Sequence, residues 1–410
     1  MIYHVTSQVS GGATASLRGG AGVERRNAPL IGRLLLAAAL VLVVTACSDG
    51  EGADPATTLA STSAAPGSAP TSAPDVTGVV SLRWEDLPPV PLSAGRSQLT
   101  IVAGGDRYLF VLGGVLGDVS SAVFPGDGAY FDASTSEWSA MPDPPFPLLA
   151  NTTATWSGAE LVVLSAGYDA PVLASFDPET ATWRTVVLGD QTVAPAYLGA
   201  HDDTVVLYGM PGRVYDSQAV LTVDLASGAV AELARSPLDS LMQPWSVLVR
   251  DGVAIVAGIS VTTGVGQIAV LDLAASSWTG PFETDGALSA LLPAGDGHST
   301  AVILAPDGTR TLADFDPATG TLSEPGVPFA IEDELYAVAY GSTGVGVVAV
   351  GGFSAETDDW VDVVEVVGPD GALALPPVPG GPAECVVAPS RIWCIDPASM
   401  AVVALPLHRP

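Results

Sequence analysis

Phe131-Asp132-Ala133-Ser134-Thr135-Ser136-Glu137-Trp138 is the stretch that decides the fold, because its pattern of an apolar residue, Asp and a second apolar residue six positions later returns four more times. The five units are Phe131-Asp132 with Trp138, Phe176-Asp177 with Trp183, Val223-Asp224 with Val230, Leu271-Asp272 with Trp278, and Phe315-Asp316 with Leu322. Successive Asp residues lie 45, 47, 48 and 44 positions apart. This period is typical of one four-stranded propeller blade per repeat.

Each unit has a simple physical interpretation as two strands joined by a turn. An inner strand ends at the Asp, whose side chain makes an Asx-type turn, and the chain returns as an outer strand that carries the Trp. Upstream lies a hairpin of the same shape, such as Thr100 to Ala103 followed by Tyr108 to Leu112. Short β-rich runs separated by Gly, Pro and Asp continue throughout, so the fold class is all-β.

Counting the strands predicts how the ring closes. A sixth unit spans Tyr336 to Leu375, and the remainder, Glu384 to Leu407, contains three strand candidates. We expect Val79 to Trp84 to supply the missing fourth strand, which joins both ends in one blade and removes the open edge. The sequence therefore predicts a seven-bladed β-propeller of four-stranded blades over residues 79–410, closed by an N-terminal strand.

Further motifs give this propeller a family resemblance. Gly113-Gly114 and Gly351-Gly352 end second strands, and a proline-rich loop, Met141-Pro142-Asp143-Pro144-Pro145, follows one Trp. Together with the aromatic-Asp-Pro turns, this pattern resembles the kelch repeat, which implies a propeller of the galactose-oxidase/kelch superfamily. Other propeller families stay open, including quinoprotein-like ones, because their turns resemble Asp316-Pro317-Ala318-Thr319-Gly320.

The N-terminal residues predict an export signal. Arg25, Arg26 and Arg33 precede an uncharged run from Leu34 to Ala46, which is too short for a spanning helix and typical of a signal peptide. Val44-Thr45-Ala46-Cys47 resembles the bacterial lipobox, which implies that the Cys47 thiol carries lipid. We expect a signal peptide over residues 1–46, of which residues 1–22 precede an alternative start at residue 23.

Residues 47–78 are expected to be a lipidated Cys47 followed by an unfolded tether, because Ser, Thr, Ala, Pro and Gly offer almost nothing to bury. The predicted partner of this region is the cytoplasmic membrane, reached through the lipid anchor. The predicted location is the extracytoplasmic face of the cell membrane.

Charge and residue types limit the chemistry. The basic residues are fourteen Arg with no Lys, against 44 acidic residues, and the net charge is -30. No nucleic acid is expected as a partner, because phosphate binding needs a basic stripe. His201, His298 and His408 are not paired at ligand spacing with another His or Cys, so no metal site is predicted. No catalytic residue and no cofactor is predicted either, since nucleophile-elbow and phosphate-loop patterns are absent.

Three long connections between second and third strands are the candidates for recognition, because scaffolds place binding residues on such loops. They are Val115 to Asp127, Met210 to Gln218 and Phe353 to Asp362. The candidate ligand-binding residues are Arg213, Tyr215, Asp216, Glu356, Asp358, Asp359 and Trp360. We expect a membrane-anchored binding or scaffold module for an extracytoplasmic protein or glycan. The alternative is a propeller enzyme that acts on glycans or envelope material.

Cys385 and Cys394 are predicted to form a disulfide bond. If Pro389-Ser390 is the tip of a tight hairpin, the two cysteines face each other as a non-hydrogen-bonded pair, within disulfide range. An export signal implies an oxidising compartment, where such a pair oxidises. The alternative is that both are buried small apolar residues in a blade strand.

Overall fold

The computed structural model describes residues 82–407, apart from short internal segments. These segments are 118–120, 149–151, 166–171, 189–192, 212–218, 240, 261, 295–296, 332–334, 337, 355–358, 369–370 and 382. The predicted signal peptide, Cys47 and the tether lie outside the described residues, as do Arg213, Tyr215, Asp216, Glu356 and Asp358.

The described residues form seven antiparallel four-stranded blades, which confirms the predicted fold class. Blade 1 is β3 (Thr100–Gly104), β4 (Tyr108–Leu112), β6 (Gly128–Asp132) and β7 (Glu137–Ala140). Blade 2 is β8 (Thr153–Trp156), β9 (Leu161–Ser165), β10 (Val172–Asp177) and β11 (Thr182–Val187), and blade 3 is β12 (Val193–His201), β13 (Thr204–Pro211), β14 (Ala219–Asp224) and β15 (Val230–Glu232). Blade 4 is β16 (Leu241–Arg250), β17 (Val253–Ser260), β18 (Gly266–Asp272) and β19 (Ser277–Glu283), and blade 5 is β20 (Ala287–Pro293), β21 (Ser299–Leu304), β22 (Arg310–Asp316) and β23 (Thr321–Leu322).

The last two blades are less regular. In blade 6 the innermost strand is divided into β24 (Leu335–Tyr336) and β25 (Ala339–Thr343), followed by β26 (Gly346–Ser354), β27 (Asp359–Gly368) and β28 (Gly371–Ala374). Blade 7 combines β29 (Glu384–Ala388), β30 (Arg391–Ile395) and β31 (Val402–Pro406) with β1 (Glu85–Leu87). A separate pair, β2 (Arg96–Ser97) and β5 (Val115–Leu116), lies outside the blades.

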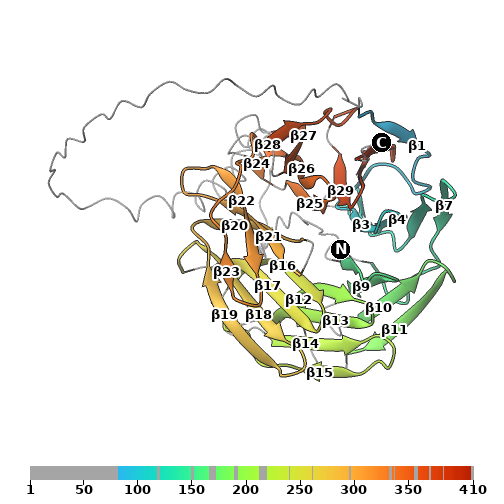
Figure 1. Cartoon of the computed structure of the whole chain (residues 1–410). Coiled ribbons are helices and arrows are strands. Elements are labelled where there is room, and N and C mark those ends of the chain that lie inside the picture. Colours follow the sequence, from blue (N-terminus) through green and yellow to red (C-terminus); the bar gives the residue numbers. More distant parts are fainter. Residues whose placement is uncertain are drawn as a thin grey trace, which may run out of the picture. The chain divides into compact units, whose positions relative to one another are not determined.

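The seven blades form a closed ring around their innermost strands. Each innermost strand contacts the next, in the order β3, β8, β12, β16, β20, β25, β29 and back to β3. Figure 1 shows the blades following one another around this ring in chain order. Seven clusters of buried apolar side chains each join two neighbouring blades, so apolar burial between blades is the main source of stability.

The five predicted Asp turns are confirmed, and in each the Asp carboxylate accepts from a backbone N–H two or three residues further on. The Asp132 carboxylate accepts a hydrogen bond from the backbone N–H of Ser134 at 2.8 Å, and the residue four positions after the Asp, Ser136, has positive φ. The left-handed residue recurs at this position in every repeat, as Ala181, Gly228, Ser276 and Gly320. The side chain thus satisfies backbone donors that the tight turn leaves unpaired.

The repeated Trp residues bind each blade to the one before it. The indole N–H of Trp138 in blade 1 donates to the carbonyl O of Pro88, directly after the outer strand of blade 7, at 2.7 Å. The indole of Trp183 makes the same bond to Pro142 of blade 1 at 2.9 Å. Trp278 bonds to Ala234 at 2.8 Å and Trp84 to Pro376 at 3.0 Å. These four Trp residues therefore pack between neighbouring blades.

Blade 7 contains strands from both ends of the propeller, but the N-terminal strand is not the one expected. The strand is Glu85–Leu87, which pairs with Val402–Ala404 of β31, whereas Leu82 to Trp84 form no strand and Val79 to Ser81 lie outside the described residues. In Figure 1 the blue β1 lies beside the red strands of this blade. The shift has a physical reason: the Trp84 indole is directed towards the backbone of blade 6, and the ladder begins only after it.

The predicted hairpin and disulfide near the C-terminal end are confirmed. Cys385 lies opposite Cys394 and Ala388 lies opposite Arg391, so Pro389-Ser390 is the hairpin tip. The two sulfur atoms are bonded, and the Cα atoms are 4.1 Å apart. The bond links the two inner strands of the blade that closes the ring.

Candidate functional site

The propeller has two ends with different connections. At one end, the loop end, lie the connections between the second and third strands and those between blades. At the other, the turn end, lie the hairpin turns between the first and second strands and the five Asp turns. The binding loops predicted from the sequence belong to the loop end.

A buried arginine organises the longest described connection at the loop end, which leads from β4 to β6. Arg96 is 3% exposed, and its guanidinium makes a bidentate ion pair with Asp127 at 2.6 and 2.8 Å. It also donates to the carbonyl O of Gly113 at 2.8 Å and to Ser93. The Arg96 side chain therefore connects both ends of the loop to the segment that precedes blade 1. The Arg96 hydrogen bonds lower the pKa of the Asp127 carboxyl.

The same loop carries an exposed apolar tip. Its first residues, Val115–Leu116, pair with Arg96–Ser97, and Leu116 and Val123 exchange two backbone hydrogen bonds of 2.9 Å. Val123 of this bridge is 60% exposed, and the next residue, Phe124, is 45% exposed. An aromatic side chain fixed on an ordered loop binds with a small loss of conformational entropy. We call Val123 and Phe124 the apolar tip.

The β26–β27 connection places one predicted residue on the same end of the propeller. Trp360 is 42% exposed, and its ring packs edge-on against Phe353 at 5.8 Å between centroids. Asp359 begins β27, but its side chain lies outside the described part, as do the other predicted binding residues. Of the predicted binding residues, therefore, the structure places the side chain of Trp360 alone.

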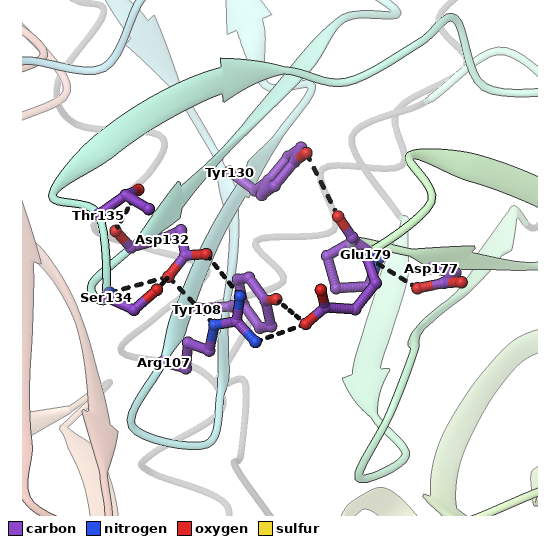
Figure 2. Close-up of polar contacts among 9 residues, drawn as sticks. Arg107, Tyr108, Tyr130, Asp132, Ser134, Thr135, Asp177 and Glu179 are labelled. Atoms are coloured by element: carbon purple, nitrogen blue, oxygen red, sulfur yellow. Dashed lines mark hydrogen bonds and ion pairs between the residues drawn. The ribbon is translucent and has the colours of Figure 1, made fainter.

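A second polar cluster lies at the turn end, between blades 1 and 2, and Figure 2 shows its contacts. The Arg107 guanidinium donates to both carboxylate oxygens of Asp132, at 3.2 and 2.8 Å, and also pairs with Glu179 of blade 2. The Tyr108 hydroxyl donates to the same Glu179 carboxylate at 2.7 Å. The Arg107 guanidinium carbon lies 4.6 Å from the centre of the Tyr108 ring.

The protonation states of this cluster are fixed. The hydrogen bond from Arg107 lowers the pKa of Asp132 to about 2, and the bond to Asp132 raises the pKa of Arg107. Burial, and then the bond to Glu179, raise the pKa of the Tyr108 hydroxyl. None of the three exchanges a proton near neutral pH, so the cluster stabilises the contact between blades and is poorly suited to acid–base catalysis.

A half-buried carboxyl lies near the joint between blades 7 and 1. Glu384 begins β29 at the loop end, and burial raises its pKa to about 7, although hydrogen bonds from the backbone N–H groups of Leu99 and Gln98 oppose the shift. A carboxyl that titrates near neutral pH is a feature of many catalytic sites, but it also occurs in structural ones. Here the backbone N–H bonds give Glu384 a structural role, because they connect β29 to the residues before β3.

The described residues offer neither a metal centre nor a membrane-spanning helix. No group of three or more His, Cys, Asp and Glu side chains is arranged to hold a metal ion in this part of the chain. The described ranges also contain no helix of sufficient length and apolar character to cross a membrane.

The closed ring, its blades and its loop end define this chain as a seven-bladed β-propeller protein. No protein-family model and no curated protein matches it. A chain in the crystal structure of the mitotic checkpoint complex has a TM-score of 0.51 and 13% identity, and the match covers 86% of this chain and 99% of that one. A chain in the structure of YjhT has a TM-score of 0.45 and 11% identity, covering 71% and 99%. The first likeness supports the propeller fold.

The length of the β4–β6 loop can be read from the sequence, but the residues that organise it cannot. Arg96 and Asp127 are 31 positions apart and belong to no repeated motif. One signal was present: in a chain with so few cations, an Arg beside an apolar strand is a candidate for burial in an ion pair. The exposure of Phe124 could not be read from its residue type.

Proposed function

We propose that this protein is a binding or scaffold module held on the extracytoplasmic face of a membrane by a lipid on Cys47, and that it recognises a protein partner through the loop end of the propeller. A propeller fold is consistent with a protein-binding or scaffold role. The observation that carries the proposal is the apolar tip, Val123 and Phe124, on a loop fixed by Arg96.

The chemistry of the loop end favours a protein surface. Aromatic residues dominate the binding energy of protein interfaces, and an exposed apolar group on an ordered loop gains most from being covered. Phe124 lies on the β4–β6 connection and Trp360 near the start of β27, so both lie at the loop end, although on different blades. A partner with an apolar centre and a basic rim would also complement the net charge of -30.

The anchor rests on the sequence. The apolar run Leu34 to Ala46 followed by Cys47 resembles a lipoprotein signal. We also propose that the blades are kelch-like repeats, on the sequence resemblance described above. Mass spectrometry of the membrane fraction is expected to find a mature N-terminus at a lipidated Cys47. A soluble mature protein that begins elsewhere would contradict the anchor but would leave the loop-end proposal standing.

Affinity capture from cell envelope tests the loop end. The full chain is compared with a variant that carries both Val123→Ser and Phe124→Ser. This variant should capture at least tenfold less partner, because it lacks the two apolar side chains that binding would remove from water. Leu373→Ser is the matched control, because Leu373 is 60% exposed on the outer strand of blade 6, away from the loop end. Equal capture by all three proteins would refute the proposal.

A further inference from the structure

The Trp that joins neighbouring blades belongs to a layer of side chains that crosses each blade. In blade 1 the layer is Ala103, Leu109, Phe131 and Trp138, which lie opposite one another in successive strands. These four residues pack against blade 7, and the indole bonds to the carbonyl of Pro88 there. The indole thus fills the outer part of the groove between two blades.

Three blades lack the Trp, and in two of them another side chain crosses the groove. Between blades 2 and 3, Arg184 of β11 donates to the carbonyl O of Leu225. Between blades 4 and 5, the Phe282 ring of β19 packs against Phe315 at 5.8 Å between centroids. It lies so close to Gly320 that a Cβ at this position would overlap the ring. In both cases a side chain of the preceding blade occupies the space that the Trp fills in other grooves.

The groove between blades 5 and 6 has no such replacement among the described residues. In blade 6 the layer consists of Ser342, Val347, Val367 and Ala372, each aligned with its neighbour as in blade 1. All four positions carry small or medium side chains, and Ala372 stands where the Trp would be. On the other side, β23 of blade 5 has just two residues and carries no aromatic residue.

The missing volume appears as a cleft of about 340 Å³ between these two blades. Ser342, Val347 and Val367 of the blade 6 layer line it, together with Gly326 and Val327 of blade 5. The backbone N–H of Gly326 bonds to the Leu312 carbonyl, just as that of Met141 bonds to Gly128 before the acceptor Pro142. The Gly326–Val327 segment therefore takes the position whose carbonyl accepts an indole bond between other blades.

The wall formed by blade 5 carries negative charge. Asp314 and Glu324 line the cleft beside the hydroxyls of Thr300 and Ser323, and no Arg or His is among its lining residues. The Thr300 hydroxyl donates a long hydrogen bond of 3.4 Å to the Asp314 carboxylate at this wall. An apolar floor with carboxylates on one side complements a flat ring that carries a positive charge.

We propose that the cleft between blades 5 and 6 is a binding site for an aromatic amine. The ring takes the place of the missing indole against Val347 and Val367, and the ammonium group faces Asp314 and Glu324. The volume is at the lower end of the range for small-molecule sites, which suits a bicyclic ring with a short side chain. None of the residues that line this cleft belongs to the β4–β6 or β26–β27 connection, so the site is independent of the loop-end proposal.

Calorimetric titration of the full chain with tryptamine tests the site. Saturable binding is expected, and indole-3-acetate, which carries the same ring and the opposite charge, should not bind. Ala372→Trp should weaken tryptamine binding at least tenfold, because the new indole fills the cleft. Leu373→Trp is the matched control: adjacent strand residues point to opposite faces, so its indole stays outside and binding should be unchanged.

A second variant keeps the test decisive if Ala372→Trp does not fold, which circular dichroism would reveal. Asp314→Asn combined with Glu324→Gln removes both charges from surface positions and should weaken tryptamine binding about tenfold, with loss of its salt dependence. The proposal is overturned if the wild-type chain shows no saturable binding of tryptamine. It is also overturned if the folded Ala372→Trp variant, or the double variant, binds as tightly as the wild type.

Discussion

Replacing Glu384 with Gln should make the stability of the propeller less dependent on pH. Burial raises the pKa of this carboxyl from 4.5 to about 7 in the folded protein. Between these two values the folded state binds more protons than the unfolded state, so the free energy of unfolding falls as pH rises through this window. Above pH 7 the whole cost of the buried charge is present.

The size of this cost follows from the shift. A change of this extent corresponds to about 3 kcal/mol, and this is an upper limit because Glu384 keeps partial access to solvent. Gln has the same shape, stays neutral and retains an oxygen that can accept the N–H bonds of Leu99 and Gln98. Glu384→Gln should therefore stabilise the chain by about 2 kcal/mol at pH 8 and have little effect at pH 4.5.

Urea denaturation of both proteins at pH 4.5, 6 and 8 measures the difference. Glu137→Gln, at an exposed position of β7, controls for the loss of one negative charge from an acidic chain. An equal difference in the free energy of unfolding between wild type and Glu384→Gln at all three pH values would contradict this prediction. The same pH-dependent difference for Glu137→Gln would also contradict it, because the cause would then be general charge repulsion.

Three further predictions concern the contacts that hold the ring together. Trp138→Phe keeps an aromatic ring but removes the hydrogen bond to Pro88 of the preceding blade. Urea denaturation should show that the free energy of unfolding falls by about 1 kcal/mol. An unchanged midpoint would show that this bond does not contribute to stability. Thiol labelling of the denatured, unreduced chain should find Cys385 and Cys394 blocked, and two labelled thiols would refute the bond. Gly320→Ala should lower the melting temperature more than Gly264→Ala, because both have positive φ but the second faces open space; equal losses would contradict the overlap with the neighbouring ring.

The features that were predicted correctly are those that recur or that follow from local pairing. The Asp turn appears five times at nearly equal spacing, and a pattern of this kind defines the blade and its period. The alignment of Cys385 with Cys394 followed from the short hairpin between them, where the tip fixes every pair. Both inferences need no information about residues far away in the chain.

The features that were missed depend on what neighbouring blades bring together. The closing strand was expected at Val79 to Trp84, yet the ladder uses the more polar Glu85–Leu87. An outer strand needs few apolar residues, so hydrophobicity is a weak guide to its limits. The cleft between blades 5 and 6 was not foreseen either, since an absent Trp leaves a cavity only if no other side chain enters its place.

The pairing of β1 with β31 also has a consequence for how the protein is made. These strands join residues about 320 positions apart, so the ring-closing pairing is among the contacts with the highest cost in loop-closure entropy. A ribosome produces β1 near the start of the propeller and β31 near its end. In a chain whose blades fold in order, β1 lacks its partner until β31 is in place, and β31 presents an open edge until β1 pairs with it. A partner that reached either strand first would compete with closure of the ring.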